Sequence, residues 1–68
     1  MKNRLEQLRL QRSLTQQELA DRVEVSRQTV ISLERGRYNP SIILAFKLAR
    51  LLDCRIEDLF LFEEEDHD

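Results

Sequence analysis

Residues 14–36, LTQQELADRVEVSRQTVISLERG, decide the fold of this 68-residue chain. They predict two short helices joined by a tight turn. Thr15 and Glu18 form a capping box, in which the hydroxyl accepts a hydrogen bond from a first-turn backbone N–H and the carboxylate reaches back to the N–H of Thr15. Ser26 is a good N-cap for the second helix. Gly36 stands at the usual C′ position and ends that helix.

Each of these two helices is predicted to have an apolar face and a polar face. Apolar residues recur at helical spacing and predict a buried side, namely Leu19, Ala20 and Val23 in the first helix and Val30 and Leu33 in the second. The outward positions of the second helix carry Arg27, Gln28, Thr29 and Ser32. A bland solvent-facing helix would favour Glu and Lys, whereas Arg, Gln, Thr and Ser hydrogen-bond base edges and phosphates. The pattern therefore favours a DNA-reading helix.

The stretch and its surroundings resemble the Cro and phage-repressor type of helix-turn-helix domain, the XRE-like family of bacterial and phage regulators. The resemblance runs in series through LTQQELA, VSRQTVISLERG, YNPS and ILAFKLARLL, and it covers roughly residues 4–60. One departure is visible at Glu24, where the family's turn usually has Gly. A left-handed conformation there costs a non-Gly residue on the order of 1 kcal/mol, which the fold can tolerate.

Composition limits the chain to one small domain. At 41% hydrophobic and 35% charged residues it is too apolar for disorder, and one Gly and one Pro leave little room for a β-rich fold. No run approaches the roughly 18 apolar residues of a membrane span, and no signal peptide is visible, so we expect a cytoplasmic protein. The resemblance implies that its source is a bacterium, an archaeon or a phage. Cys54 is alone, and its apolar neighbours favour a buried structural thiol.

The net charge of −2 seems unsuited to a DNA-binding protein, but the acidic residues are unevenly placed. Residues 63–68 hold five of the 13 acidic residues. Residues 1–62 therefore carry 11 basic and 8 acidic residues, a balance of +3. We expect a helix-turn-helix DNA-binding domain over residues 1–62 and a disordered acidic tail over residues 63–68. That tail could compete with DNA for the basic face, or it could simply be solubilising.

The remaining segments predict three more helices and an all-α, five-helix fold. Residues 4–12 place Leu5 and Leu8 on one face of a first helix. After a loop that contains Pro40, Ser41 can cap a helix that runs to about residue 52. Residues 55–60 form a short fifth helix with a weaker cap, and its inward side chains are Ile56 and Leu59.

The helix over residues 41–52 is apolar nearly all round. One stripe and its neighbours comprise Ile42, Leu44, Ala45, Leu48, Ala49 and Leu52, while Ile43, Phe46 and Leu51 fall outside it. A helix of this kind is buried against a partner when the chain is too small to have a deep centre. We therefore expect a homodimer contact with Phe46 as its anchor, and Ile43, Leu51 and Leu61 as further candidates. Ordinary hydrophobic scatter is the alternative.

The resemblance adds two structural expectations. In the family, an arginine at the position of Arg9 pairs with a glutamate near the end of the recognition helix, which matches Glu34. A plain surface arginine is the alternative. Members of similar length end in a strand that pairs with the extended N-terminus, so Phe60-Leu61-Phe62 and residues 1–3 would form a small antiparallel sheet near the dimer seam.

The resemblance also implies which side chains would read the bases. The second helix of the motif, about residues 26–35, would enter the major groove with Arg27, Gln28 and Ser32 at base-contacting positions. Arg27 can hold guanine O6 and N7 with two parallel hydrogen bonds, and Gln28 suits adenine N6 and N7. Thr29 would touch a phosphate or a thymine methyl.

Further residues match the family's contacts to the DNA backbone. Gln16 matches a residue whose side chain and helix-end N–H hold a phosphate, with help from the helix dipole. Gln17 is a weaker candidate. The loop residues that would meet the backbone of the same half-site are Arg35, Arg37, Tyr38 and Asn39. For each of these positions the alternative is a solvated polar residue.

Symmetry then implies a mechanism. A two-fold dimer would present two recognition helices about 34 Å apart, one DNA turn, to an inverted repeat in double-stranded DNA. Bound over a promoter, such a dimer would exclude polymerase and act as a repressor, while an upstream position would allow recruitment.

Two other classes of function, an enzyme and a protein-interaction module, fit the sequence less well. Catalysis would need a nucleophile, a base and a pocket, yet the only His is His67 in the acidic tail and no glycine-rich phosphate loop is present. No metal, cofactor or small-molecule ligand is expected, because one Cys and one His fall short of a structural zinc set.

An antitoxin-like or adaptor module, which binds protein, is the stronger alternative. An adaptor has no need for Arg27 and Gln28 together with Arg35 and Arg37 on one side, and the tail is short for a toxin-wrapping extension.

Overall fold

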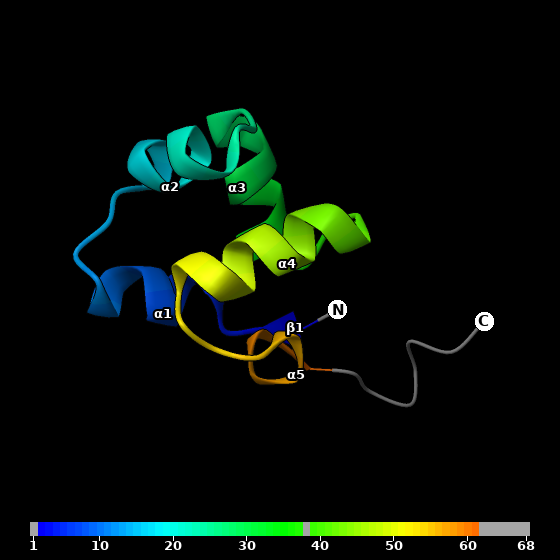
Figure 1. Ribbon diagram of the computed structural model, residues 1–68. Coiled ribbons are helices and arrows are strands. Elements are labelled where there is room, and N and C mark those ends of the chain that lie inside the picture. Colours follow the sequence, from blue (N-terminus) through cyan, green and yellow to red (C-terminus); the bar gives the residue numbers. More distant parts are fainter. Residues whose placement is uncertain (1, 38, 62–68) are drawn as a thin grey trace.

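The computed structural model describes residues 2–37 and 39–61. In chain order its elements are β1 (Lys2–Asn3), α1 (Leu5–Gln11), α2 (Gln16–Val23), α3 (Arg27–Glu34), α4 (Ile42–Leu51), α5 (Ile56–Leu59) and β2 (Phe60–Leu61). The five helices and the small terminal sheet confirm the predicted repressor-like fold (Figure 1). Met1, Tyr38, Phe62 and the tail predicted over residues 63–68 lie outside the described residues.

The helices of the central motif begin where the sequence predicts. The Thr15 hydroxyl accepts from the backbone N–H of Glu18 at 3.0 Å, and the Glu18 carboxylate accepts from the N–H of Thr15 at 2.8 Å. These hydrogen bonds, first the one from the backbone of Thr15, hold the pKa of Glu18 below its ordinary value. Ser26 and Ser41 cap α3 and α4 in the same way, each Oγ accepting from a backbone N–H at 3.1 Å. Each such cap contributes about 1 kcal/mol.

The turn between α2 and α3 passes through the left-handed conformation at Glu24, with φ 62° and ψ 43°. The family resemblance implies a left-handed turn at this residue. The Glu24 carboxylate lies 3.0 Å from Nζ of Lys47, but both side chains are exposed, so the ion pair contributes little to stability. Ser13 and Asp53 are also left-handed without being glycine, whereas Gly36, just beyond α3, adopts φ 69° at no steric cost.

Every helix contributes to a single core. The fully buried large side chains are Leu5, Leu19, Val30, Leu33, Leu48 and Leu59. In Figure 1, α4 crosses the molecule with the α2–α3 pair on one side and α5 with β1 on the other. The predicted apolar faces of α2 and α3 are therefore confirmed, and packing of their inner sides leaves their outer sides to solvent.

A buried ion pair joins α1 to α3. Nε of Arg9 lies 2.6 Å from Oε2 of Glu34, and both side chains are more than nine-tenths buried. Arg9 also donates to the carbonyl oxygen of Leu14 at 2.8 Å. The pairing implied by the resemblance is confirmed. A buried pair of this kind specifies how two helices sit together more than it raises stability.

The two ends of the described chain meet in an antiparallel sheet, as expected. Lys2 pairs with Leu61 and Asn3 pairs with Phe60. The Asn3 amide donates to the carbonyl oxygen of Leu33 at 2.8 Å, and its Oδ1 accepts from the N–H of Leu5 at 3.0 Å. Asn3 therefore ties the sheet to the last turn of α3.

Three expectations near α4 were wrong. Ile42 is 70% exposed rather than part of the buried stripe, because the first turn of α4 extends past α3 (Figure 1). Leu51 is partly buried against the core rather than outside it, and Cys54 is half-buried rather than buried. Partial burial raises the pKa of the Cys54 thiol, and the nearby carboxylate of Asp58 adds to that rise.

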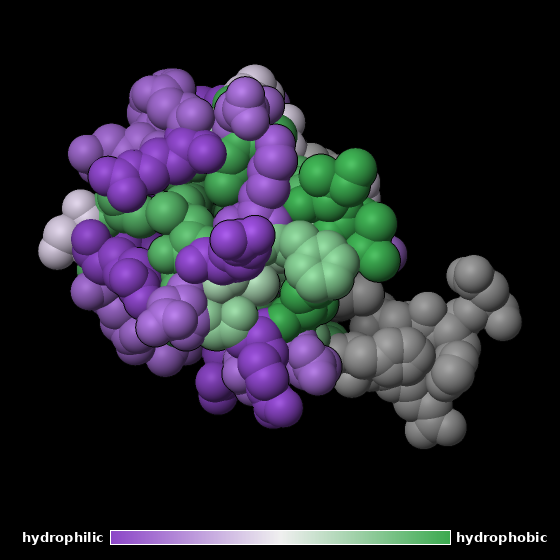
Figure 2. Space-filling view, in the orientation of Figure 1, coloured by the Kyte–Doolittle hydropathy of each residue, from purple (hydrophilic) through white to green (hydrophobic). Residues whose placement is uncertain are grey.

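Two of the three residues of α4 that the sequence placed outside the buried stripe, Ile43 and Phe46, are exposed, and Ile42 joins them. Ile43 is 67% exposed and Phe46 is 53% exposed, and Leu61 on β2 is 37% exposed. Figure 2 shows an apolar area over the exposed end of α4. We call Ile42, Ile43, Phe46 and Leu61 the apolar face.

Candidate nucleic-acid interface

The outer side of α3 carries the residues predicted to read bases. Val30 and Leu33 anchor the inner side of the helix in the core. Arg27 and Gln28 in the first turn are exposed, and Ser32 is half-buried one turn later. The helix thus presents its polar end outward while its position is set by packing beneath.

Thr29 lies beside the cap of α3 rather than on the free polar side. Its Oγ1 lies 3.0 Å from Oγ of Ser26, and its backbone N–H donates to the same oxygen. The hydroxyl is therefore already engaged within the protein. A contact from Thr29 to DNA would use its methyl group or a second hydrogen bond of the hydroxyl.

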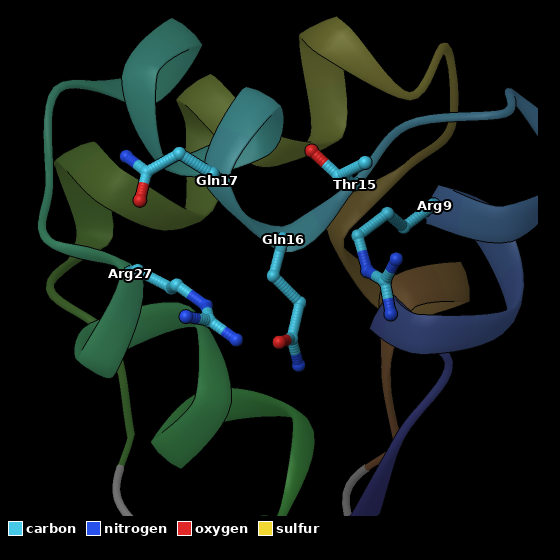
Figure 3. Close-up of a pocket in the computed structure, with 5 residues that line it drawn as sticks. All are labelled: Arg9, Thr15, Gln16, Gln17 and Arg27. Atoms are coloured by element: carbon cyan, nitrogen blue, oxygen red, sulfur yellow. The ribbon is translucent and has the colours of Figure 1, made fainter.

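A hollow of about 610 Å³ lies between α1, the start of α2 and the start of α3. It is lined by Arg9, Thr15, Gln16, Gln17 and Arg27, and Figure 3 shows Gln16 extending between the guanidinium groups of Arg27 and Arg9. Backbone N–H groups at the start of α2 give this region a partial positive charge. The hollow is thus a cationic recess that suits an anion such as a phosphate.

Gln16 connects this recess to the buried ion pair. Its Nε2 donates to Oε1 of Glu34 at 3.1 Å, the same carboxylate that accepts from Arg9. An amide nitrogen has two hydrogens, so one remains for a ligand. Glu34 therefore fixes the orientation of Gln16 as well as that of Arg9, a link that sequence reasoning did not find.

Gln17 is placed less favourably than Gln16. Its Nε2 donates to Oδ1 of Asp21 at 2.9 Å, one turn along α2. Figure 3 shows its side chain pointing away from Gln16. The structure thus brings Gln17 to the rim of the recess, but its bond to Asp21 holds the amide on the outer side of α2.

A second hollow, of about 380 Å³, adjoins the first and is lined mainly by residues of α3. Gln16 and Arg27 line both hollows. The remaining residues that line the second hollow are Glu6, Ile31, Glu34 and Arg35. Sequence reasoning missed Glu6 and Ile31. The signal for Ile31 was its position four residues from both Arg27 and Arg35, since residues at that spacing are neighbours on a helix surface.

The predicted backbone-contacting residues begin at the C-terminal end of α3 and continue into the loop that follows it. Arg35 is the C-cap of α3 and lines the second hollow. Arg37 and Asn39 are exposed, and the backbone N–H of Arg37 donates to the carbonyl oxygen of Ser32 at 3.0 Å. Tyr38 belongs to the predicted set but falls outside the described residues.

The cations of this surface differ in whether their charge is already paired. Arg9 is paired with Glu34. Within residues 2–37 and 39–61, no acidic group lies within ion-pair distance of Arg27, Arg35 or Arg37. Three exposed, unpaired guanidinium groups therefore surround α3, and their charge is available to an anionic partner.

Across residues 2–37 and 39–61, no cluster of three or more His, Cys, Asp or Glu side chains is arranged to hold a metal ion. Over those ranges there is also no helix with the length and apolar character needed to cross a membrane.

Comparisons with known proteins agree with this geometry. A family model described as helix-turn-helix matches residues 5–59. An HTH-type transcriptional regulator of Archaeoglobus fulgidus is 48% identical over 66 residues, which cover 97% of this chain and 93% of the relative. The restriction-modification controller protein C.AhdI of Aeromonas hydrophila has a TM-score of 0.75 at 38% identity, covering 84% of this chain and 86% of its own. A chain of the SINR protein/SINI protein complex has a TM-score of 0.78 at 30% identity, covering 96% of this chain and 64% of its own.

Proposed function

The chain belongs to the helix-turn-helix family of DNA-binding transcriptional regulators, and we propose that it binds an inverted-repeat operator as a homodimer and represses transcription. The observation that carries this proposal is the exposure of Arg27 and Gln28, side by side at the start of α3. The N-terminal residues of a recognition helix are those that reach base edges in the major groove.

The base-reading roles follow from side-chain chemistry. Arg27 would hold O6 and N7 of a guanine with two parallel hydrogen bonds, and Gln28 would pair with N6 and N7 of an adenine. Ser32, one turn later, would reach the next base or a sugar–phosphate oxygen. These contacts supply specificity, whereas the contacts to phosphates supply position.

The phosphate-binding roles fall to the cationic recess and to the exit of α3. Gln16 would donate its free amide hydrogen to a phosphate that the N-terminus of α2 also attracts. Gln17 and Thr29 would contribute at the rim of the recess. The exit loop would contact the adjacent backbone through Arg35, Arg37, Tyr38 and Asn39.

The apolar face would join the two copies. Its two isoleucines and one phenylalanine lie within the first five residues of α4, and Leu61 belongs to the terminal sheet. Phe46 would be the central anchor, because aromatic side chains dominate the energetics of such contacts. Ile43 would flank it, and Leu51 would contribute only the part of its side chain that the core leaves uncovered.

A protein-binding role, of the antitoxin or adaptor type, is the second candidate. The exposed isoleucines and phenylalanine of α4 favour it, and one structural neighbour comes from a protein–protein complex. In that case the apolar face would receive a different protein, and the cations around α3 would have no assigned role.

Selection of bound oligonucleotides from a random pool, at stated salt, tests the proposal. We expect an inverted repeat whose half-site centres lie about 10 base pairs apart, because two-fold related recognition helices are one DNA turn apart. Affinity should fall steeply with salt, since phosphate contacts release counterions. Failure to enrich any sequence would favour the protein-binding role, and enrichment of a lone half-site would reject the homodimer.

A further inference from the structure

Ile31 is an apolar residue on the otherwise polar side of α3. It lies one turn after Arg27 and one turn before Arg35, and it lines the second hollow together with both arginines. Its side chain is half-buried. An isoleucine therefore sits between two exposed guanidinium groups, at the centre of the surface that would face DNA.

The core does not account for this residue. The buried side chains of α3 that belong to the core are Val30 and Leu33, and the half-buried apolar residues packed against it lie elsewhere. Ile31 faces the hollow instead, where its neighbours are charged or polar. A half-buried position at the edge of a polar hollow would ordinarily carry a polar side chain, since the part of an apolar side chain that stays in water gains nothing until something covers it.

The chemistry of the major groove provides such a cover. Of the four bases only thymine presents an apolar group there, its 5-methyl, and apolar side chains recognise it by contact. Resting on the proposed function, we infer that Ile31 reads the 5-methyl group of a thymine in each half-site. Arg27 would hold a guanine on one side of Ile31, and Arg35 would hold the DNA backbone on the other. Ile31 would then lie against the floor of the major groove.

A purely structural role for Ile31 makes a different prediction. Glu34 lines the same hollow, and Ile31 could shield the Arg9–Glu34 pair from water. In that case, truncation of Ile31 would lower the thermal stability of the protein and weaken its binding to all DNA sequences alike. Removal of a methyl reader would abolish the preference for thymine over uracil, a difference that protein stability cannot imitate.

The test uses the full chain and the operator recovered from the random pool. Each thymine of one half-site is replaced in turn by uracil, which lacks only the 5-methyl. Wild-type protein should lose about three- to fivefold in affinity at one thymine, because burying a methyl-sized apolar group contributes roughly that factor. Ile31→Ala should bind thymine and uracil operators equally at that position. Placing 5-methylcytosine rather than cytosine there should strengthen wild-type binding and leave Ile31→Ala unchanged.

Leu10→Ala is the matched control, because Leu10 is an exposed leucine on α1 that lines neither hollow. It should keep the full thymine–uracil difference. If Ile31→Ala does not fold, Ile31→Val should show a reduced difference, and the wild-type uracil series stands without either variant. The inference is overturned if no thymine in the half-site shows a methyl effect, or if Ile31→Ala keeps it. Failure to recover any operator would overturn the proposed function together with it.

Discussion

The outer sides of α3 and α4 are both exposed, and their chemistry is opposite. The outer side of α3 carries unpaired arginines, and beneath it polar bonds fix the helix to α1 and to the terminal sheet. The exposed end of α4 carries two isoleucines and a phenylalanine. Recognition of a duplex needs a helix whose orientation cannot drift, whereas association of two copies needs apolar area that can be covered. In the proposed function these two tasks fall to two different helices.

The largest expected effect is on the free energy of unfolding, when the ion pair between Arg9 and Glu34 beneath α3 is broken. Arg9→Ala would leave the Glu34 carboxylate buried without its cation, and breaking a buried pair in this way costs about 3–5 kcal/mol in free energy of unfolding. That is a large share of the stability of a small domain. Urea denaturation followed by circular dichroism would measure it. Arg50→Ala, which removes an exposed arginine of α4, is the control and should change stability little. An unaltered midpoint for Arg9→Ala would contradict the role given to the pair.

On α4 the largest effect should appear in association rather than in folding. Phe46→Ala removes the proposed anchor, and loss of such an anchor typically costs about 2 kcal/mol or more in dimer affinity. The free energy of unfolding of the monomer should hardly change, because Phe46 lies outside the core cluster.

Sedimentation equilibrium over a range of protein concentrations would separate these two quantities. Leu10→Ala removes an apolar side chain of similar exposure, 59% against 53%, from α1 and should leave the dimer intact. Equal dissociation constants for Phe46→Ala and the wild type would place the contact between copies elsewhere.

Within the polar surface, two arginines should differ in what they contribute. Arg27→Ala should relax the base preference at one operator position. Its binding free energy for the operator with the preferred base should weaken by about 1–3 kcal/mol. Arg37→Ala should instead weaken binding to all sequences alike and lower the salt dependence. Mobility-shift titrations of both variants on matched and mismatched operators would tell them apart. The reverse pattern would reject the assignment of Arg27 to a base and Arg37 to the backbone.

The central motif was predictable because its signals are local. The caps at Thr15 and Ser26 involve partners three residues away, and two apolar stripes flank the short turn, although only the family resemblance placed its left-handed residue at Glu24. The Arg9–Glu34 pair spans 25 residues, and only the family resemblance pointed to it. The periodicity of apolar residues within one helix does not indicate which residues far apart in the sequence come into contact.

The candidate site was predictable in its residues but not in its connections. The bond from Gln16 to Glu34 spans 18 residues, and the hollow that holds Ile31 and Glu6 forms only when α1 packs beside α3. Ile42 and Leu51 were misplaced for a related reason. Periodicity states which side chains share a face of α4, but the extent of its neighbours decides how much of each turn is covered.

The smallest effect concerns pH and the cap that positions α2. The hydrogen bonds between Glu18 and Thr15 lower the pKa of the Glu18 carboxyl in the folded state. The bonded carboxylate therefore stabilises the protein at any pH above the ordinary pKa of a glutamate. That contribution is lost as the pH falls through the lowered folded pKa. Glu18→Gln should keep the bond to the Thr15 N–H, because glutamine also completes a capping box, while removing the titration.

Thermal unfolding of the wild type and of Glu18→Gln between about pH 6 and pH 2 would show the difference. The two midpoints should nearly coincide at pH 6, and the wild type should lose more stability on acidification. Asp58 offers an internal comparison, because hydrogen bonds from Arg55 lower its pKa at the start of α5, and Asp58 lines neither of the hollows beside α3. Asp58→Asn should therefore reduce the acid sensitivity of folding in the same direction while leaving α2 and its recess unchanged. Parallel curves for the wild type and Glu18→Gln would show that the cap of α2 does not depend on the charge of Glu18.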